Sequence, residues 1–289
     1  MKTRIFHLHS LSAVHVGTGQ GVGAVDLPIA RSRATNLPIV PGSSLKGVLR
    51  DEAKDKWHLD NNDICALFGS ESTADSSHAS AAVFGDAQLL ILPIRSFAGT
   101  IAYATCPFIL QRYRRDLGLS INVPNSNETA QTVPESLLLL ADKQSIALED
   151  LDMKAECTDS ASQWAQTIAQ FLYPEGTENQ NAWREQFIKR FIILPDSEFS
   201  FLSDTATEIR MRIKIDRQTR IVQTGALWSE ENLPAETILW GIMGIDSSRY
   251  AKVKKDAEAL SALIPQGETS IQIGGKHTVG RGLCRLLLD

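Results

Sequence analysis

The sequence lacks several features that would place it in a familiar class. Its four cysteines form no CxxC pair, which argues against a zinc cluster and fits reduced thiols. No apolar run approaches the roughly 18 residues of a membrane span, so no membrane partner is expected. Residues 1–10 lack the long apolar stretch of a secretory signal, and we therefore expect a cytoplasmic protein. Aromatic residues make up only 7% of the chain, which disfavours a base-stacking sheet.

The remaining composition is that of an ordinary globular protein. The chain has 289 residues, of which 43% are hydrophobic and 22% are charged, and this excludes a wholly disordered protein. Segments with strand and helix periodicity interleave without regular βαβ spacing, and no internal repeat is visible. The sequence therefore predicts an α+β fold, built as one continuous domain over residues 1–289.

Two insertions are expected within this domain. Apolar residues at helical spacing, Trp164, Ile168 and Phe171, lie in the acidic middle of the chain and predict a helical insertion. The stretch from Asp216 to Pro234 is rich in turn residues and follows a segment that alternates like a strand. It precedes the apolar run ETILWGIMGI, so it predicts a projecting hairpin.

The net charge of −5 is unevenly distributed along the chain. Residues 1–50 carry six basic side chains and one acid, and residues 95–115 carry four arginines and no acid. Residues 121–159 instead carry eight acids and two lysines. A polyanion-binding face beside a solvated or protein-facing insertion would give this pattern. Ordinary variation among surface charges explains it equally well.

A capped helix with two basic residues is predicted after Pro41. Ser43 or Ser44 is a suitable N-cap, and Lys46 and Arg50 lie one helical turn apart. A helix N-terminus binds anions, so these four residues could contact RNA phosphates. A surface helix with two solvated basic residues is an equally good interpretation.

Glycine-rich stretches occur near both ends of the chain. Neither GTGQGVG nor GGKHTVG has the spacing of a dinucleotide or Walker motif, which disfavours nucleotide cofactors. With the two residues that follow it, the second stretch reads GGKHTVGRG, in which Lys276 and Arg281 stand among four glycines. Two cations among glycines predict a clamp for a nucleic-acid backbone, whereas a tight structural turn is the alternative.

Asp26 and His15 are the candidate catalytic residues. Asp26 is the only acid among residues 1–50, and such a carboxylate could hold a divalent metal or accept a proton from a ribose hydroxyl. His15 borders the same loop and could act as acid or base near neutral pH. The structural alternatives are a turn at Asp26 before Pro28, and a loop hydrogen bond at His15.

Two separated motifs resemble the signatures of the RAMP superfamily of CRISPR proteins. They are PGSSLKGVLR with its preceding loop HVGTGQGVGAVDLPI, and HTVGRG near the end of the chain. Within that superfamily, VDLPI, FIILPDSEFSFL and VQTGALWSEENLPAETILW are similar to the backbone subunits of type III-B Cmr effector complexes. The resemblance implies a ferredoxin-like (RRM-like) palm at about residues 1–110, 190–215 and 237–289. It further implies a helical insertion at about 111–189 and a β-hairpin thumb at about 216–236.

The resemblance also implies an activity. Proteins of this family bind CRISPR RNA along a helical filament, together with copies of themselves and other Cmr subunits, and cleave complementary target RNA at regular intervals. Asp26 matches the cleavage residue of the family, His15 its HxGTG histidine and Lys46 the lysine of GSSLKG. A divalent metal, Mg²⁺ or Mn²⁺, is the expected cofactor, with Asp26 as its candidate ligand.

Two other functions remain compatible with the same residues. In one, the chain is a non-catalytic scaffold that binds CRISPR RNA, and Asp26 only shapes its loop. In the other, it is a metal-independent ribonuclease that processes CRISPR RNA with His15. Cleavage in EDTA would be expected only of the processing enzyme.

Overall fold

The computed structural model describes residues 1–19, 21, 23–70, 77–125 and 129–289. The strands of its main sheet are, in chain order, β1 (Lys2–Ser10), β2 (Ile39–Val40), β3 (Ala82–Phe84), β4 (Ala87–Ser96), β5 (Thr100–Thr105), β6 (Ala130–Thr132), β7 (Ser145–Leu148), β8 (Leu151–Cys157), β9 (Phe191–Ile193), β12 (Ile238–Ile245), β13 (Gly267–Gln272) and β14 (Leu283–Leu288). The order across this sheet is β13-β14-β1-β12-β4-β5-β9-β6-β8-β7, with β2 paired to β4 and β3 to β12. Strands β10 (Glu208–Ile215) and β11 (Val222–Asn232) form a separate antiparallel pair.

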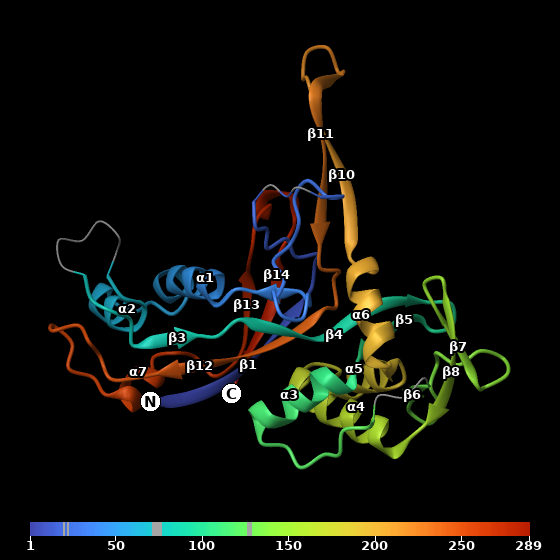
Figure 1. Cartoon of the computed structure of the whole chain (residues 1–289). Helices are drawn as coiled ribbons and strands as arrows, with labels where there is room; N and C mark the ends of the chain where they lie inside the picture. The colour runs from blue at the N-terminus through green and yellow to red at the C-terminus, as the bar shows by residue number, and fades with distance from the viewer. Residues whose placement is uncertain (20, 22, 71–76, 126–128) are drawn as a thin grey trace.

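Seven α-helices and one 3-10 helix complete the part of the chain that the structure describes. The α-helices are α1 (Gly42–Asp55), α2 (Asn61–Phe68), α3 (Pro107–Leu117), α4 (Asp159–Leu172), α5 (Gln180–Ile188), α6 (Asp196–Thr205) and α7 (Ala257–Ser261), and the 3-10 helix is η1 (His277–Val279). Helices α1, α2 and α7 lie at one end of the molecule, whereas α3, α4 and α5 lie with β6–β8 at the other (Figure 1). This mixture of helices and strands confirms the predicted α+β class. Within the described residues, no helix combines the length and hydropathy needed to span a bilayer.

Each end of the molecule has its own hydrophobic core. In one, α1 buries Leu45 and Leu49 against β1, β12 and β14, since these residues recur at helical spacing. In the other, α4 buries Trp164 and Ile168 beside α3, β4, β5 and β9. The sheet passes through both cores and joins the two ends.

At the end of the molecule that contains α1, strand β1 lies between β12 and β14. This pairing brings the residues that follow β1 beside the C-terminal glycine-rich loop. The backbone amide of Gly275 donates to the carbonyl oxygen of His15 at 2.8 Å. A Cβ at Gly274 would collide with the same carbonyl, and its φ of 87° also favours glycine. The two glycine-rich stretches predicted from sequence therefore meet in space.

The segment expected to be a helical insertion, residues 111–189, is mixed instead. It contains the end of α3, helices α4 and α5, and strands β6, β7 and β8. These strands extend the main sheet beyond β9. They are only three to seven residues long, so their sequences are too short to show a clear period of two.

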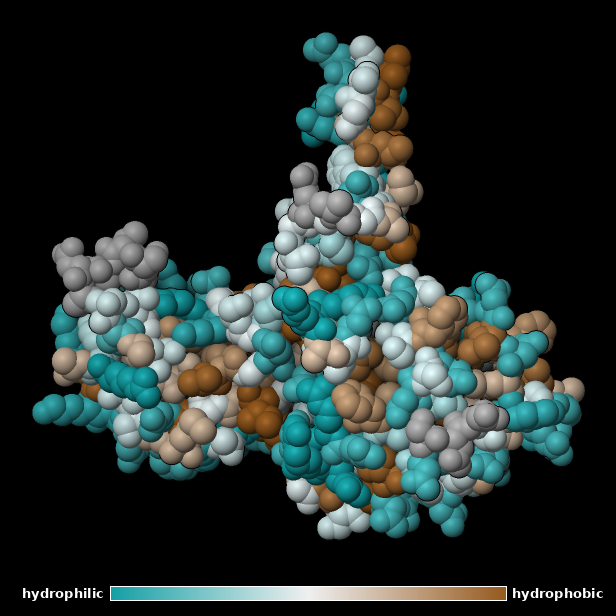
Figure 2. Space-filling model, viewed as in Figure 1, coloured by the Kyte–Doolittle hydropathy of each residue, from teal (hydrophilic) through white to brown (hydrophobic). Residues whose placement is uncertain are grey.

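The projecting hairpin begins earlier than the sequence predicts. Its two strands span 208–215 and 222–232, so the expected thumb at 216–236 covers only the turn and the second strand. The first strand alternates like one that packs on a core, yet its apolar residues are 48–62% exposed (Ile209, Met211, Ile213 and Ile215). Figure 2 shows apolar residues along one side of the projecting hairpin and polar residues along the other.

Candidate active site

The loop that carries Asp26 is folded against hairpin strand β11. Its two arms pair with each other through Gly17 and Ile29, and the Ala30 amide donates to the Val16 carbonyl at 2.8 Å. Leu27 then lies beside β11: its amide donates to the Ser229 carbonyl, and its own carbonyl accepts from the Glu231 amide. The base of the hairpin therefore fixes the course of the loop.

Asp26 and Ser229 are joined by three hydrogen bonds. The Asp26 amide donates to Ser229 Oγ at 3.0 Å, while the Ser229 amide and Oγ donate to Asp26 Oδ2 at 2.7 and 2.8 Å. The backbone hydrogen bond from Ser229 is the largest cause of a lowered pKa for the Asp26 carboxyl. The side chain is exposed, and Oδ1 takes no hydrogen bond from another described residue. Asp26 thus presents an ionised carboxylate with one oxygen open to a ligand.

His15 is buried beside the same strand. Its Nδ1 donates to the Glu231 carbonyl at 2.7 Å, and in the neutral ring this leaves Nε2 as an acceptor. A Cβ at Gly17 would lie only 2.7 Å from Nε2, so the ring packs closely against glycine backbone. The side chain is 6% exposed. His15 therefore joins the loop to β11, so its hydrogen bond reaches the hairpin strand instead of staying within the loop.

The second arm of the loop is held by Glu231, which sequence reasoning missed. Its carboxylate accepts from the Ile29 amide at 3.1 Å and from the Arg31 guanidinium at 2.6 Å. Arg31 also pairs with Asp204 of α6 at 3.0 Å. Glu231 and Ser229 lie two residues apart on β11, so their side chains share one face of the strand.

Lys276 and Arg281 both contact the fully buried carboxylate of Glu230. Arg281 Nε lies 3.7 Å from Glu230 Oε1, and Lys276 Nζ lies 3.9 Å from Oε2. Arg212 of β10 approaches the same carboxylate at 3.3 Å. The Arg281 side chain is only 9% exposed, whereas that of Lys276 is 34% exposed and also faces the Trp228 ring. The C-terminal loop thus compensates a buried charge at the base of the hairpin.

The N-terminus of α1 differs from the sequence prediction. Pro41 is the N-cap, and neither Ser43 nor Ser44 makes a side-chain cap. The Gly42 amide instead donates to Asp86 Oδ1 at 2.9 Å, so a carboxylate of the protein already faces this helix end. Gly42 is required because a Cβ there would collide with the carbonyl of Phe84.

Lys46 and Arg50 lie one turn apart on α1, as predicted. Lys46 Nζ donates to Ser80 Oγ at 2.8 Å, and Arg50 Nη1 donates to the Gly69 carbonyl at 2.9 Å. Desolvation, followed by the nearby Arg50 charge, lowers the pKa of the Lys46 ammonium. Helix α1, which carries Ser43, Ser44, Lys46 and Arg50, lies apart from the hairpin in Figure 1. The structure thus gathers Asp26, His15, Lys276 and Arg281 around β11, and it places the α1 residues in a second group.

A divalent metal at Asp26 would obtain only part of its coordination from the protein. The described residues contain no group of three His, Cys, Asp or Glu side chains that could hold a metal ion. Mg²⁺ is commonly bound through one or two carboxylates together with waters and substrate phosphates. The open Oδ1 of Asp26 fits this arrangement, in which the protein supplies one carboxylate oxygen and waters and substrate phosphates supply the other ligands.

The comparisons with known proteins cover nearly the whole chain or all of it. The RAMP superfamily profile matches residues 7–285. The CRISPR system Cmr endoribonuclease Cmr4 of Pyrococcus furiosus is 32% identical and is matched over 100% of this chain and 96% of its own length. The CRISPR system CMR subunit Cmr4 of Saccharolobus solfataricus is 25% identical over 97% and 94%. A crystal structure of oligomeric Cmr4 from Pyrococcus furiosus superposes with a TM-score of 0.75 at 26% identity, covering 100% and 98%.

Proposed function

The chain belongs to the RAMP superfamily, and from this we propose that it is a backbone subunit of a type III-B Cmr effector complex. In this proposal it binds CRISPR RNA in the cytoplasm, assembles with copies of itself and other Cmr subunits, and cleaves the complementary target RNA at regular intervals. Support comes from full-length similarity to a relative named as an endoribonuclease and from the likeness to an oligomeric crystal structure.

The observation that carries the catalytic part of the proposal is the Asp26 carboxylate. It is exposed and ionised, and Ser229 fixes one of its oxygens while the other stays open. A carboxylate with a lowered pKa is a weak base, so its role is to orient rather than to remove a proton. We assign Oδ1 to holding a ribose 2′-hydroxyl, or a metal bound beside it, next to the scissile phosphate.

Cleavage then follows as a transesterification within the RNA. The 2′-oxygen forms a bond to phosphorus as its proton passes to water, and the bond from phosphorus to the 5′-oxygen breaks. The departing 5′-oxygen takes a proton from water, which leaves a 2′,3′-cyclic phosphate and a 5′-hydroxyl. The protein contributes alignment, because the 2′-oxygen must lie in line with the departing oxygen. A bound Mg²⁺ or Mn²⁺ would supply positive charge opposite the phosphate oxygens.

We also assign the end of the molecule that contains α1 and α7 to a ferredoxin-like (RRM-like) palm. The strand order there is β14-β1-β12, continuing into β3 and β4, and α1 and α7 occupy the two connections along the chain. The hairpin β10–β11 would be the thumb that separates paired nucleotides at intervals. Recognition of sequence would then come from the guide RNA, which agrees with the low aromatic content.

The test is a reconstituted complex with guide RNA and labelled target RNA. Asp26→Asn keeps the size of the side chain and, through its amide oxygen, can still accept the two hydrogen bonds from Ser229, but it removes the charge and replaces the second oxygen by an NH₂ group. We expect it to abolish the cuts while target affinity stays at the wild-type level. The exposed Asp152 provides the matched control, and Asp152→Asn should cut normally.

Two outcomes would redirect the proposal. Normal cutting by Asp26→Asn, or no cutting by the wild-type complex with Mg²⁺ or Mn²⁺, would leave the chain as a non-catalytic scaffold. Cleavage of repeat RNA by the chain alone in EDTA would favour a processing enzyme. The structure gives that last function little support, because the ring of His15 is buried and bonded to β11.

A further inference from the structure

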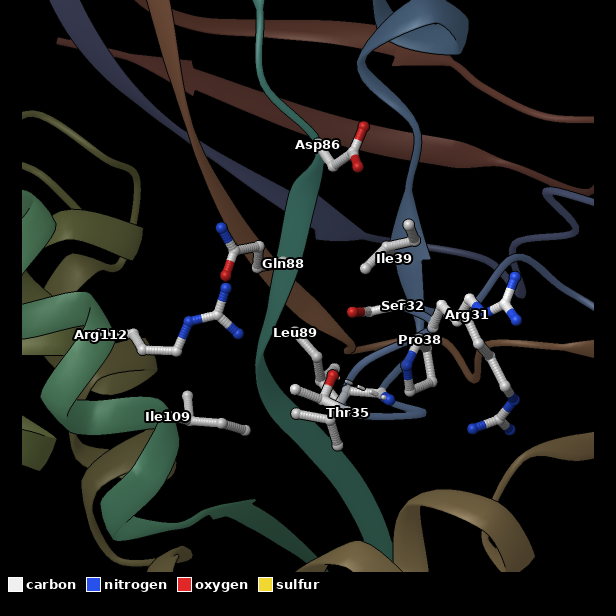
Figure 3. A pocket seen from close by; sticks show the side chains of 12 residues that line it. Arg31, Ser32, Thr35, Pro38, Ile39, Asp86, Gln88, Leu89, Ile109 and Arg112 are labelled. Atoms are coloured by element: carbon white, nitrogen blue, oxygen red, sulfur yellow. Dashed lines mark hydrogen bonds between the residues drawn. The ribbon is translucent and has the colours of Figure 1, made fainter.

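Two cavities of the protein have linings of opposite charge. The cavity beside α3 is lined by three arginines and one acid, and Figure 3 shows Arg31 and Arg112 on its opposite sides. A second cavity, of about 380 Å³, lies between the end of β1, helix α5 and the strand pair β13–β14. Three glutamates and one arginine line it. An excess of carboxylates repels a polyanion, so the second cavity is suited to a ligand other than RNA.

Two of these glutamates keep a charge that no cation compensates. Glu268 is neutralised, because Arg285 Nε and Nη2 donate to its two oxygens at 2.8 and 2.6 Å. Glu236 Oε2 lies 3.0 Å from Nε2 of His9. Arg285 Nη1 lies 3.2 Å from Nδ1 of the same ring, and since a guanidinium only donates, Nδ1 is an acceptor and the ring is neutral. Glu178 is exposed and pairs with no base among the described residues. The cavity therefore presents two carboxylates, Glu178 and Glu236, that favour a cation.

An aromatic pair belongs to the same lining. Tyr173 and Trp183 stack with their ring centroids 6.2 Å apart and their planes 13° from parallel. The guanidinium carbon of Arg285 lies 5.4 Å from the Tyr173 centroid, so this pair already binds one guanidinium group of the protein itself. Trp183 is 53% exposed, which leaves part of its ring open to a second cation. Tryptophan is the aromatic side chain that attracts cations most strongly.

The edge of the cavity has the character of a protein-docking surface. Leu11 and Trp183 both line the cavity, and they are 49% and 53% exposed. A metal ion would gain nothing from these apolar surfaces, and the described residues contain no group of three side chains that could hold one. A protein partner would cover them on docking and would remove their apolar area from water.

The carboxylates, the indole ring and the apolar edge together define the ligand. We propose that this cavity receives an arginine side chain from a partner protein. The guanidinium group lies against Trp183 and is attracted by the carboxylates of Glu178 and Glu236, while the partner's backbone covers Leu11. Arginine is favoured over lysine, because its planar group stacks on aromatic rings and forms paired hydrogen bonds with carboxylates. The inference stands apart from the proposed function, since it uses neither RNA nor Asp26.

The experiment follows the indole N–H signals of the isotope-labelled full-length chain by NMR during titration with acetyl-Gly-Arg-Gly-amide at constant salt. The chain has five tryptophans, and Trp183→Phe identifies the signal of Trp183. We expect this signal to shift in a saturable manner, while those of the buried Trp164 and Trp240 stay in place. The same peptide with citrulline in place of arginine keeps the shape but not the charge, and it should cause no shift.

Glu178→Gln tests the attraction by the cavity. Because one of the two uncompensated carboxylates is lost, we expect the variant to bind the arginine peptide several-fold more weakly. Glu175→Gln is the matched control, since Glu175 lies in the same loop and is exposed but does not line the cavity. It removes the same charge and should bind like the wild type. Unchanged signals from the other tryptophans report that both variants are folded.

Four results would overturn the inference. They are no shift of the Trp183 signal, an equal shift with the citrulline peptide, equal weakening by Glu178→Gln and Glu175→Gln, and equal binding of a peptide with lysine in place of arginine. The third would reduce the attraction to overall charge, and the fourth would remove the preference for a guanidinium group. All four leave the proposed function standing, because that function fails only if the reconstituted complex neither binds nor cuts RNA.

Discussion

Asp26 and Ser229 hold each other by three hydrogen bonds although 203 residues separate them in the sequence. One partner lies in the glycine-rich loop and the other at the base of the hairpin. The serine is therefore a positioning residue for the carboxylate. The loop and the hairpin form one structural unit at the candidate active site.

Replacing Ser229 should slow cleavage without weakening RNA binding. Ser229→Ala removes the hydroxyl from Asp26 Oδ2, and hydrogen bonds to charged groups contribute about 1.5–3 kcal/mol. We expect the single-turnover rate of the reconstituted complex to fall at least about tenfold. Ser229→Thr, which keeps the hydroxyl, should recover most of the rate. Thr224→Ala on the exposed part of the same strand should cut normally. A normal rate for Ser229→Ala would assign the serine to the fold alone.

Arg281→Met distinguishes a structural arginine from a phosphate ligand. The side chain is buried against Glu230, and losing one partner of a buried ion pair typically costs about 3–5 kcal/mol. Because Arg212 and Lys276 remain near the same carboxylate, we expect the lower end of that range in the free energy of unfolding. Urea titration measures the change. Unchanged stability together with a smaller salt slope for RNA binding would instead make Arg281 a phosphate contact.

Lys46→Ala should weaken RNA binding for every sequence. Loss of one phosphate contact lowers the salt slope by about 0.7 for single-stranded RNA, whereas loss of the bond to Ser80 alone leaves the slope unchanged. Lys54→Ala on the exposed face of the same helix is the control. Equal slopes for both variants would remove Lys46 from the RNA contacts.

Stability should fall as the pH is lowered from 7 to 5. His7 is buried, and its Nε2 lies 2.7 Å from the Tyr113 hydroxyl; burial lowers the pKa of His7 to about 4. In the unfolded chain His7 has an ordinary pKa near 6.5, so it takes up a proton as the pH falls from 7 to 5. In the folded chain its lowered pKa keeps it neutral over the same range. Linkage gives a loss of about 2 kcal/mol between pH 7 and pH 5. In urea titrations at both values, His7→Gln should lose this part of the pH dependence; an unchanged dependence would exclude His7 as its source.

The sequence predicted those features whose signals are local. Helices α1 and α4 were recognisable because large apolar residues recur every three or four positions, and both are buried on that face. The start of the hairpin was misplaced, because the alternation of Ile209, Met211 and Ile213 is the same whether or not a core covers it. The sequence of one strand does not show whether another element packs against its apolar face.

The sequence supplied candidate residues for the site but not their contacts. Asp26 and Lys46 were identified from their motifs, and each lies where a ligand could reach it. Lys276 and Arg281 were identified as cations among glycines, yet their contacts with Glu230 depend on a strand about fifty residues earlier in the chain. The adjacent acids Glu230 and Glu231 at the end of β11 were the available signal. Burial of both distinguishes them from solvated surface charge.

The attachment of the loop to β11 has a mechanical consequence. Leu27 and Asp26 are bonded to the strand through both main chain and side chain, so displacement of the strand carries the carboxylate with it. The hairpin and the Asp26 loop then act as one lever, with the projecting strands as its long arm and the candidate active-site carboxylate on its short arm. Seating of the tip and alignment of the carboxylate become a single motion.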